Sequence, residues 1–501
     1  MLLLACLAAC ATSPGVVATE ARSIGTSTAS TTSTPTTETS PTTSPSIPTD
    51  TEPPHRTTTT STATRNEYGI GDPLFPSLGN PGIDVEHYDL KLRYDPLRKE
   101  ISATVHLDIA MTADRTTFSL DSDGPVVSAV TVDGAPATFK AASPELLITP
   151  VNPLTSGQRV AVEVAYTVSN PGPLPSASGG AAGWFPTPGG SYVLNEPEGA
   201  HFWLPSDDHP SDKATFRFEL TVPSGLTAVA NGALIDHTSA TSTDTWIWQE
   251  DRPMATYLIQ LLTGDYELVD GVGPNGLPLL SAVLHTDRTT MQPYIDTIDD
   301  QIDYFDDFFG PYPLSRYGIA ITDSVPGLAM ETMERSLFSR SDFSTGRLEA
   351  GQELLLSHEL AHQWFGDAVS PAGWRDIWLN ESFATYGEWM WLDHVGLRLL
   401  EDSAAAGLAG RQPGATANPS AQQLFGFNSY DGGAVVLHAL RKTIGDGNFF
   451  TLLKRWVADN NGQSRTTDDF ISLANEVTGR DLTEFFKTWL FSDTVPTTYP
   501  A

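Results

Sequence analysis

Two histidines separated by three residues constrain the fold of this chain more than any other feature. They are His358 and His362, and residues 354–368 around them contain no Pro and are rich in Leu, Ala and Glu. Such a run favours a helix, and a spacing of four residues places both imidazoles on one face of that helix. The two side chains can therefore bind one ion, and the segment that supplies a further ligand must pack against this helix.

Glu381 follows nineteen residues after His362, at the start of a second stretch with helical character. Two neutral imidazoles and a carboxylate suit Zn²⁺, and a catalytic zinc site keeps three protein ligands and one open position. The sequence therefore predicts that His358, His362 and Glu381 bind one Zn²⁺ per chain. Glu359, next to His358, is predicted to face a water molecule in the open position and to accept its proton as general base.

The histidine pair is a weak signal on its own, because the same spacing occurs by chance on polar helices whose histidines only cap or pack. Residues 374–381 support the site independently, since a glutamate at the start of a second helix can reach across to the first. We therefore interpret the two segments together as a zinc-peptidase site.

Beyond this pattern, the sequence resembles the gluzincin zinc aminopeptidases of the alanyl aminopeptidase and leukotriene hydrolase type. The resemblance covers roughly residues 80–498, nearly all of the expected globular part. It rests on segments that follow one another in the family's order: Glu196 to Ala200, Leu204 to Phe216, Tyr312-Pro313, Ala329 to Glu331, His358 to Asp367, Trp378 to Ala384 and Tyr430 to Leu437. It implies a zinc-dependent aminopeptidase that hydrolyses the N-terminal peptide bond of peptides.

The resemblance also implies roles for side chains outside the metal pattern. Glu331 matches the glutamate that binds the free α-amino group of the substrate, and Glu196 matches a second acidic contact from the N-terminal domain. Ala329 and Met330 are implied substrate contacts, and Tyr430 matches the tyrosine whose hydroxyl supports the oxyanion. Two carboxylates beside zinc would hold an ammonium group at a fixed distance from the metal, so that only the first peptide bond meets the water.

Without the resemblance, the same residues have more ordinary interpretations. Glu331 would belong to a solvated acidic face, Tyr430 would be a buried aromatic side chain, and Glu196 would be a solvated loop carboxylate. Some positions also depart from the family pattern: Leu194, His201, Leu328, Thr332 and Gly432, where many members have Gln, Arg, Gly, Asn and Lys. These positions surround the expected first residue of the substrate, so the sequence supports the activity more firmly than the specificity.

The sequence predicts a multidomain protein with two globular parts. Residues 67–268 show short alternating apolar and polar runs, separated by Pro, Gly, Asn and Asp, which predict an N-terminal all-β domain. Within residues 269–501, helical periodicity takes over from about residue 285, which predicts a mainly α domain. The resemblance implies a saddle-like first domain and a thermolysin-like zinc peptidase domain, with the substrate between them.

The first residues resemble the signal of a bacterial lipoprotein. Residues 1–10 form an apolar run that ends at Cys10, the residue that would carry the lipid. Residues 11–66 are dominated by Ser, Thr and Pro, and they predict a disordered stalk. We therefore expect an extracytoplasmic protein of a bacterial cell envelope, lipid-anchored or secreted. A chance cysteine followed by a passive linker is the alternative.

The formal net charge of -33 disfavours nucleic acid and anionic lipid headgroups as partners. No apolar run after residue 10 is long enough to span a bilayer, so contact with a membrane is expected only through the lipid anchor. The expected partners are peptide or protein N-termini, and the chain is expected to be a monomer. The sequence ends at Ala501, where the family's catalytic domain closes, so we expect a more open active site than in members with a C-terminal helical domain.

Three other functions compete with an aminopeptidase. A zinc endopeptidase would use the same ligands but would accept a blocked amino terminus. A catalytically silent cell-surface binding protein would keep the fold without the chemistry, and the intact His358, Glu359 and Glu381 argue against it. An epoxide hydrolase, the activity of one branch of the family, has no support beyond shared ancestry.

Overall fold

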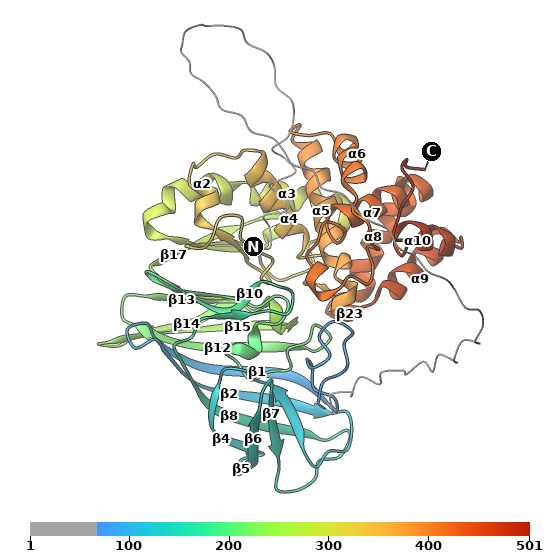
Figure 1. Cartoon of the computed structure of the whole chain (residues 1–501). Coiled ribbons are helices and arrows are strands. Elements are labelled where there is room, and N and C mark those ends of the chain that lie inside the picture. The colour runs from blue at the N-terminus through green and yellow to red at the C-terminus, as the bar shows by residue number, and fades with distance from the viewer. Residues whose placement is uncertain (1–67, 501) are drawn as a thin grey trace, which may run out of the picture.

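The computed structural model of the chain describes residues 68–500 (Figure 1). The predicted signal-like segment 1–10 with Cys10, and the predicted stalk 11–66, lie outside the described residues. Within residues 68–500, no helix combines the length and the apolar character that crossing a bilayer requires.

The first half of the described chain is built on an eight-stranded sheet. Its strands lie in the order β14 (Ala233–Ser239), β15 (Thr243–Ala255), β12 (Lys213–Pro223), β1 (Ile83–Asp95), β2 (Glu100–Met111), β8 (Arg159–Ser169), β4 (Val126–Val132) and β5 (Ala135–Pro136). β1 runs parallel to β12 and antiparallel to β2. Every second side chain of β1 from Tyr88 to Tyr94 is buried, as the alternating sequence predicts.

Two smaller sheets complete this half. One has the order β3 (Phe118–Asp121), β7 (Glu145–Thr149) and β6 (Thr138–Ala142), and the other has the order β13 (Thr227–Ala230), β16 (Leu261–Gly264), β11 (Gly190–Leu194), β10 (Ala181–Thr187) and β9 (Pro173–Pro175). The three sheets share one hydrophobic core, which contains Trp184, Trp203 and Trp248. We call the described residues up to Gly264 the β domain, and it confirms the predicted all-β part.

The second half is mainly helical. Its helices are α2 (Arg288–Asp296), α3 (Ile298–Phe309), α4 (Ala350–Ala361), α5 (Trp378–His394), α6 (Leu400–Gly410), α7 (Asp431–Ile444), α8 (Asp446–Asn460), α9 (Thr467–Thr478) and α10 (Thr483–Trp489). They bury a second core, which contains Phe305, Trp364 and Trp378. We call the described residues from Tyr266 onward the helical domain.

The helical domain also contains short strands. Five form a sheet in the order β17 (Tyr266–Val272), β18 (Pro278–Leu284), β19 (Ile319–Thr322), β21 (Ser336–Ser339) and β20 (Ala329–Met330), and β22 (Val369–Pro371) pairs with β23 (Gln463–Arg465). The sequence pattern did not resolve β19, β20 and β21, because strands of four, two and four residues are too short to show an alternation.

Two boundaries differ from the predicted ones. β17 belongs to the sheet of the helical domain, so the division between the sheets precedes the predicted boundary at residues 268 and 269. The helix predicted over residues 354–368 is α4, which ends at Ala361 and is followed by a turn that contains Gly366, with a φ of +134°. His362 caps α4 and keeps helical dihedral angles, so it still shares a face with His358.

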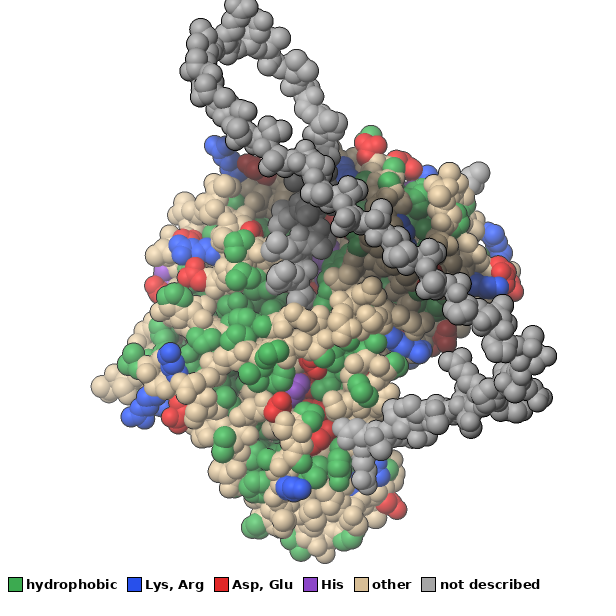
Figure 2. All heavy atoms as spheres, viewed as in Figure 1, with side chains coloured by type: hydrophobic (Ala, Val, Ile, Leu, Met, Phe, Trp, Pro, Cys, Tyr) green, Lys and Arg blue, Asp and Glu red, His purple; other side chains and the backbone are tan. Residues whose placement is uncertain are grey.

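The two domains pack closely against each other, with the sheets of the β domain below the helices in the view of Figure 1. Nζ of Lys213 donates to the carbonyl of Asp367 at 2.8 Å, and Oγ of Ser464 donates to the carbonyl of Pro210 at 2.7 Å. In the same view with all atoms drawn, Lys and Arg side chains lie as scattered groups (Figure 2), in line with 28 basic against 61 acidic residues in the chain.

Candidate metal and peptide site

A cavity of about 240 Å³ lies where the two domains meet. Its polar lining consists of Glu196, Glu331, His358, Glu359, His362, Glu381 and Tyr430. Its apolar lining consists of Ala181, Phe185, Tyr192, Leu194, Val325, Leu328, Ala329 and Met330. All the predicted site residues that the structure describes therefore line one cavity, and only Cys10 lies outside the described residues.

The three predicted metal ligands come together from two helices that pack against each other. Nε2 of His358 and Nε2 of His362, at the end of α4, each lie 3.4 Å from Oε2 of Glu381 on α5. All three side chains are buried, and their donor atoms lie within 4.8 Å of one another. One ion fits among such atoms, and two imidazole nitrogens with one carboxylate form a donor set that suits zinc.

The second nitrogen of each imidazole has its own partner. Nδ1 of His358 lies 3.0 Å from Oε2 of Glu388, and Nδ1 of His362 lies 3.1 Å from the carbonyl of Phe365. Acceptors at Nδ1 keep the proton on that atom and leave both Nε2 atoms as donors to a metal. The sequence pattern did not single out Glu388, although its position seven residues after Glu381 on one helix was an available signal.

The cavity contains more negative charge than the surrounding side chains balance. Glu196, Glu331 and Glu359 each have a buried carboxylate oxygen without a hydrogen-bond partner among the described residues, and no Lys or Arg lines the cavity. Burial, followed by the charges of Glu331 and Glu381, raises the pKa of Glu196 well above its ordinary value. Buried carboxylates without partners are costly, so this cavity is suited to cationic ligands, such as a metal ion and an ammonium group.

The pKa values of Glu359 and Glu381 shift in opposite directions. Burial raises the pKa of Glu359 to about 8, although the two histidines oppose the effect. Burial also acts on Glu381, but its hydrogen bonds to the two histidines outweigh burial and lower its pKa to about 2. In the metal-free site, where both histidines face it, the Glu381 carboxylate is thus charged.

Tyr430 reaches the same cluster from the start of α7. Its hydroxyl donates to Oε1 of Glu381 at 3.0 Å, and its ring lies 6.0 Å from the ring of His358, with the two planes at 19°. The hydroxyl therefore lies beside the predicted metal site, and its action on an oxyanion stays a prediction.

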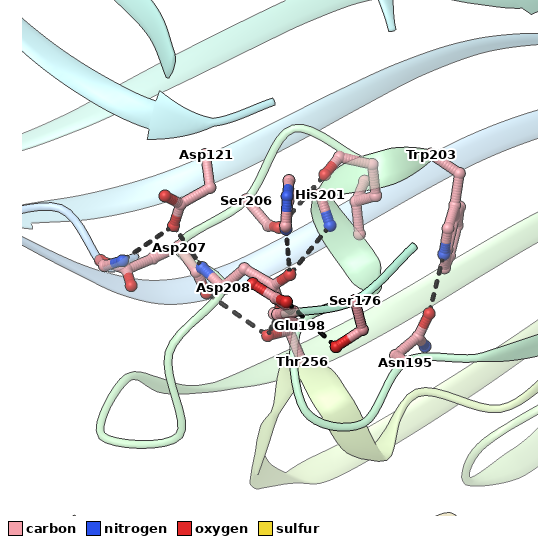
Figure 3. Close-up of polar contacts among 12 residues, drawn as sticks. Asp121, Ser176, Asn195, Glu198, His201, Trp203, Ser206, Asp207, Asp208 and Thr256 are labelled. Carbon is pink, nitrogen blue, oxygen red and sulfur yellow. Dashed lines mark hydrogen bonds and ion pairs between the residues drawn. The ribbon is translucent and has the colours of Figure 1, made fainter. Parts of the chain in front are cut away.

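Buried polar contacts hold Asn195 and His201, which flank Glu196 in the chain; Figure 3 shows the contacts of Asn195 and His201. Oδ1 of Asn195 accepts a hydrogen bond from Nε1 of Trp203 at 3.0 Å, and Nδ1 of His201 lies 2.7 Å from Oδ2 of Asp208. His201 stands where many members of the resembling family have Arg, and here it keeps a carboxylate partner. The contact of His201 with Asp208 helps to hold the loop around Glu196 in this chain.

The apolar lining on the side of the β domain comes from the hairpin of β10 and β11. The rings of Phe185 and Tyr192 stack with their centroids 5.0 Å apart and their planes at 9°. Leu194 ends the hairpin two residues before Glu196. The sequence pattern did not single out Phe185 or Tyr192, because alternation in a strand does not reveal which face meets another domain.

Comparisons with known proteins agree with this arrangement. Residues 294–489 match the family model described as the peptidase family M1 domain, and residues 84–258 match that of the peptidase M1 N-terminal domain. Similar solved structures include a mutant of a two-domain M1 zinc metallopeptidase bound to L-arginine, with 30% identity and a TM-score of 0.76. The M1 zinc metallopeptidase of Deinococcus radiodurans has 30% identity and a TM-score of 0.74. Both alignments cover 85% of this chain and 98% of the other.

Similar curated proteins are longer than this chain. Aminopeptidase M1-C of Oryza sativa subsp. japonica is 28% identical over 57% of this chain and 35% of its own length. Probable aminopeptidase 2 of Sulfurisphaera tokodaii is 28% identical over 62% of this chain and 42% of its own length. The matched region thus spans well under half of each of these two relatives.

Proposed function

The chain belongs to the M1 family of zinc metallopeptidases, and from this membership we propose that it is a zinc-dependent aminopeptidase that removes the first residue of peptides. One observation carries the proposal: a cluster of three metal-donor side chains shares its cavity with two further buried carboxylates, Glu196 and Glu331. Any zinc peptidase needs the first group. Carboxylates beside the metal donors can in addition pair with the free amino group of a substrate.

The residues present fit zinc, because they supply two imidazole nitrogens, one carboxylate and buried oxygens without partners. His358, His362 and Glu381 would hold one ion per chain. Zinc, when bound, supplies a Lewis acid that polarises the carbonyl of the scissile bond and makes a water molecule more acidic.

Glu359 would transfer the proton, and Tyr430 would stabilise the negative charge that develops on the substrate. Glu359 would accept a proton from the attacking water and return it to the leaving amine, and its buried Oε2 has no hydrogen-bond partner among the described residues. Tyr430 would donate a hydrogen bond to the oxyanion that develops on the carbonyl oxygen.

Glu196 and Glu331 would hold the α-ammonium group between the two domains. Glu196 comes from the β domain, whereas Glu331 directly follows β20 of the helical domain. Because both carboxylates line the same cavity as the metal cluster, they would fix the ammonium group at one distance from Glu359. Such an arrangement selects the first peptide bond.

Blocked amino termini test this proposal. We expect the full-length protein to hydrolyse aminoacyl-coumarin substrates and peptides with free amino termini. Their Nα-acetylated counterparts should have kcat/KM values lower by at least about 10²-fold, because a neutral amide leaves both carboxylates unpaired. Fluorescence would measure the coumarin release and mass spectrometry the peptide products.

The Glu359→Gln variant serves as the control that assigns any hydrolysis to this site. Internal cleavage of acetylated peptides would contradict the proposal and indicate an endopeptidase. Bound zinc without hydrolysis of any substrate would indicate a binding protein instead.

The apolar lining leads to a second prediction, on the first residue of the substrate. Phe, Leu or Met as first residue should be preferred over Asp or Lys by at least about tenfold in kcat/KM. The charged residues of the lining are already assigned to the metal, the water and the amino group, so none is left to pair with a charged substrate side chain. Phe185→Ala should reduce the preference for Phe over Ala, whereas Phe139→Ala, on β6 and outside the cavity lining, should not. Equal rates for Asp, Lys and Phe substrates would refute this preference.

The location of the protein is a proposal supported by the sequence of residues 1–66 alone. We propose that Cys10 carries a lipid and that residues 11–66 link it to the enzyme outside the cytoplasm of a bacterial cell, with the enzyme acting as a monomer on peptide or protein N-termini. Labelling with a fatty acid, lost in a Cys10→Ala variant, would support the anchor; equal labelling of both would argue against it.

A further inference from the structure

Tyr257 of the β domain reaches the segments that carry the predicted metal ligands. It lies in a short 3-10 turn, Thr256–Leu258, between β15 and β16, and only 1% of its side chain is exposed. Its hydroxyl donates to the carbonyl of Gly366 at 3.1 Å and accepts a hydrogen bond from Nδ2 of Asn380 at 3.2 Å. One hydroxyl thus joins two segments of the helical domain.

Each end of this bridge lies next to a metal ligand. Asn380 directly precedes Glu381 on α5, and Gly366 belongs to the turn in which the carbonyl of Phe365 contacts Nδ1 of His362. The turn is packed tightly: a Cβ added to Gly366 would lie 3.2 Å from Nδ2 of Asn380 and 3.4 Å from Nδ1 of His362. A shift of this turn would therefore move the imidazole or the amide with it.

We propose that Tyr257 is a positioning residue of the metal site. Its hydroxyl sets the distance between the turn after α4 and the start of α5, and thereby the separation of His362 from Glu381. The inference rests on the zinc site proposed above. It gives the β domain a share in metal affinity, in addition to the substrate contact through Glu196.

The surroundings make Tyr257 a rigid support. Its ring packs edge-on against Trp374, with the centroids 5.2 Å apart, and Lys213 of the same domain binds the carbonyl of Asp367 next to Gly366. Burial, followed by the nearby charge of Glu331, raises the pKa of Tyr257 well above its ordinary value. The hydroxyl therefore keeps its proton and continues to donate.

A buried tyrosine can also contribute to folding alone, and metal affinity separates the two roles. A purely structural hydroxyl would lower the melting temperature of the metal-free protein and leave the zinc dissociation constant unchanged. A positioning hydroxyl would change the dissociation constant, because removing an outer partner of a metal site typically costs about 10- to 100-fold in affinity.

The test compares the full-length wild type with Tyr257→Phe and with a matched control, Tyr266→Phe. Tyr266 is also buried, and its hydroxyl lies 2.6 Å from Oγ1 of Thr322. Neither tyrosine lines the cavity, but the partner of Tyr266 lies on β19, which carries no proposed metal ligand. Zinc dissociation constants come from competition with a chromophoric chelator. We expect about a 10- to 100-fold increase for Tyr257→Phe, less than about twofold for the control, and a changed absorption spectrum of the Co²⁺-loaded protein only in Tyr257→Phe.

The same affinity in Tyr257→Phe and wild type, or an equal loss in the control, would overturn the inference. Should Tyr257→Phe fail to fold, Asn380→Ala removes the other half of the bridge. An unchanged zinc dissociation constant in Asn380→Ala would overturn the inference equally. A wild type that binds no zinc would refute the proposed enzyme as well. A wild type that binds zinc and cleaves peptides, beside an unaffected Tyr257→Phe, would refute only the role of Tyr257.

Discussion

Replacing Glu359 by Gln is expected to lower kcat by about 10²- to 10⁴-fold while the zinc content of the protein stays the same. Gln keeps the size of the side chain but cannot accept a proton, and a positioned general base typically contributes a factor of this order. Zinc should stay bound, because the proposed ligands His358, His362 and Glu381 are unchanged, whereas the other close group of donor atoms, Glu331, Glu359 and His362, offers one imidazole only. Hydrolysis of aminoacyl-coumarin substrates, with zinc measured by atomic absorption, checks both parts of the prediction.

Glu353→Gln provides the matched control. Glu353 lies on the same helix, is 8% exposed, and accepts a hydrogen bond from Nε1 of Trp391 at 2.8 Å, outside the cavity lining. This variant should keep its zinc and most of its activity. If Glu359→Gln retained more than about a tenth of the wild-type kcat, or lost its zinc, the assignment of Glu359 as the proton acceptor would be wrong.

Replacing Tyr430 by Phe is expected to lower kcat by about 10²- to 10³-fold and to change KM little. A hydrogen bond to the oxyanion forms fully only in the transition state, and its loss therefore reduces kcat rather than substrate binding. Steady-state kinetics on one free aminoacyl substrate separate the two constants.

The control for this variant is Tyr386→Phe. Tyr386 is buried on α5, and its hydroxyl lies 3.2 Å from Nδ1 of His438, outside the cavity lining. It should retain the wild-type kcat. An equal loss of kcat in both variants, or an increase in KM alone for Tyr430→Phe, would contradict a role of Tyr430 at the oxyanion.

Local periodicity accounts for what the sequence predicted well. Alternation along β1 and β12 is a property of each strand, and it predicted the β domain without knowledge of the strand order. The spacing of His358 and His362 is likewise local, and the structure places both Nε2 atoms at the same distance from Glu381. The end of α4 was less predictable, because the turn after it depends on a positive φ at Gly366 rather than on a pattern of apolar residues.

Pairings between distant segments account for what the sequence did not predict. Tyr257 and Gly366 are 109 residues apart, and nothing in either neighbourhood marks the other as a partner. The contact of Lys213 with Asp367 spans 154 residues in the same way. Such contacts depend on how the two folded domains pack against each other. A periodic pattern within one helix or strand contains no information about this packing.

The hairpin of β10 and β11 has a consequence for how such enzymes can diversify. Residues 181–196 include Phe185, Tyr192 and Glu196, whereas the proposed zinc ligands lie on α4 and α5 of the other domain. Part of the selectivity would thus be encoded apart from the chemistry, since the hairpin supplies half of the apolar lining and residues 325–330 of the helical domain supply the rest. Substitutions confined to this hairpin would alter which N-terminal residue the enzyme prefers. The residues that bind the metal would stay unchanged.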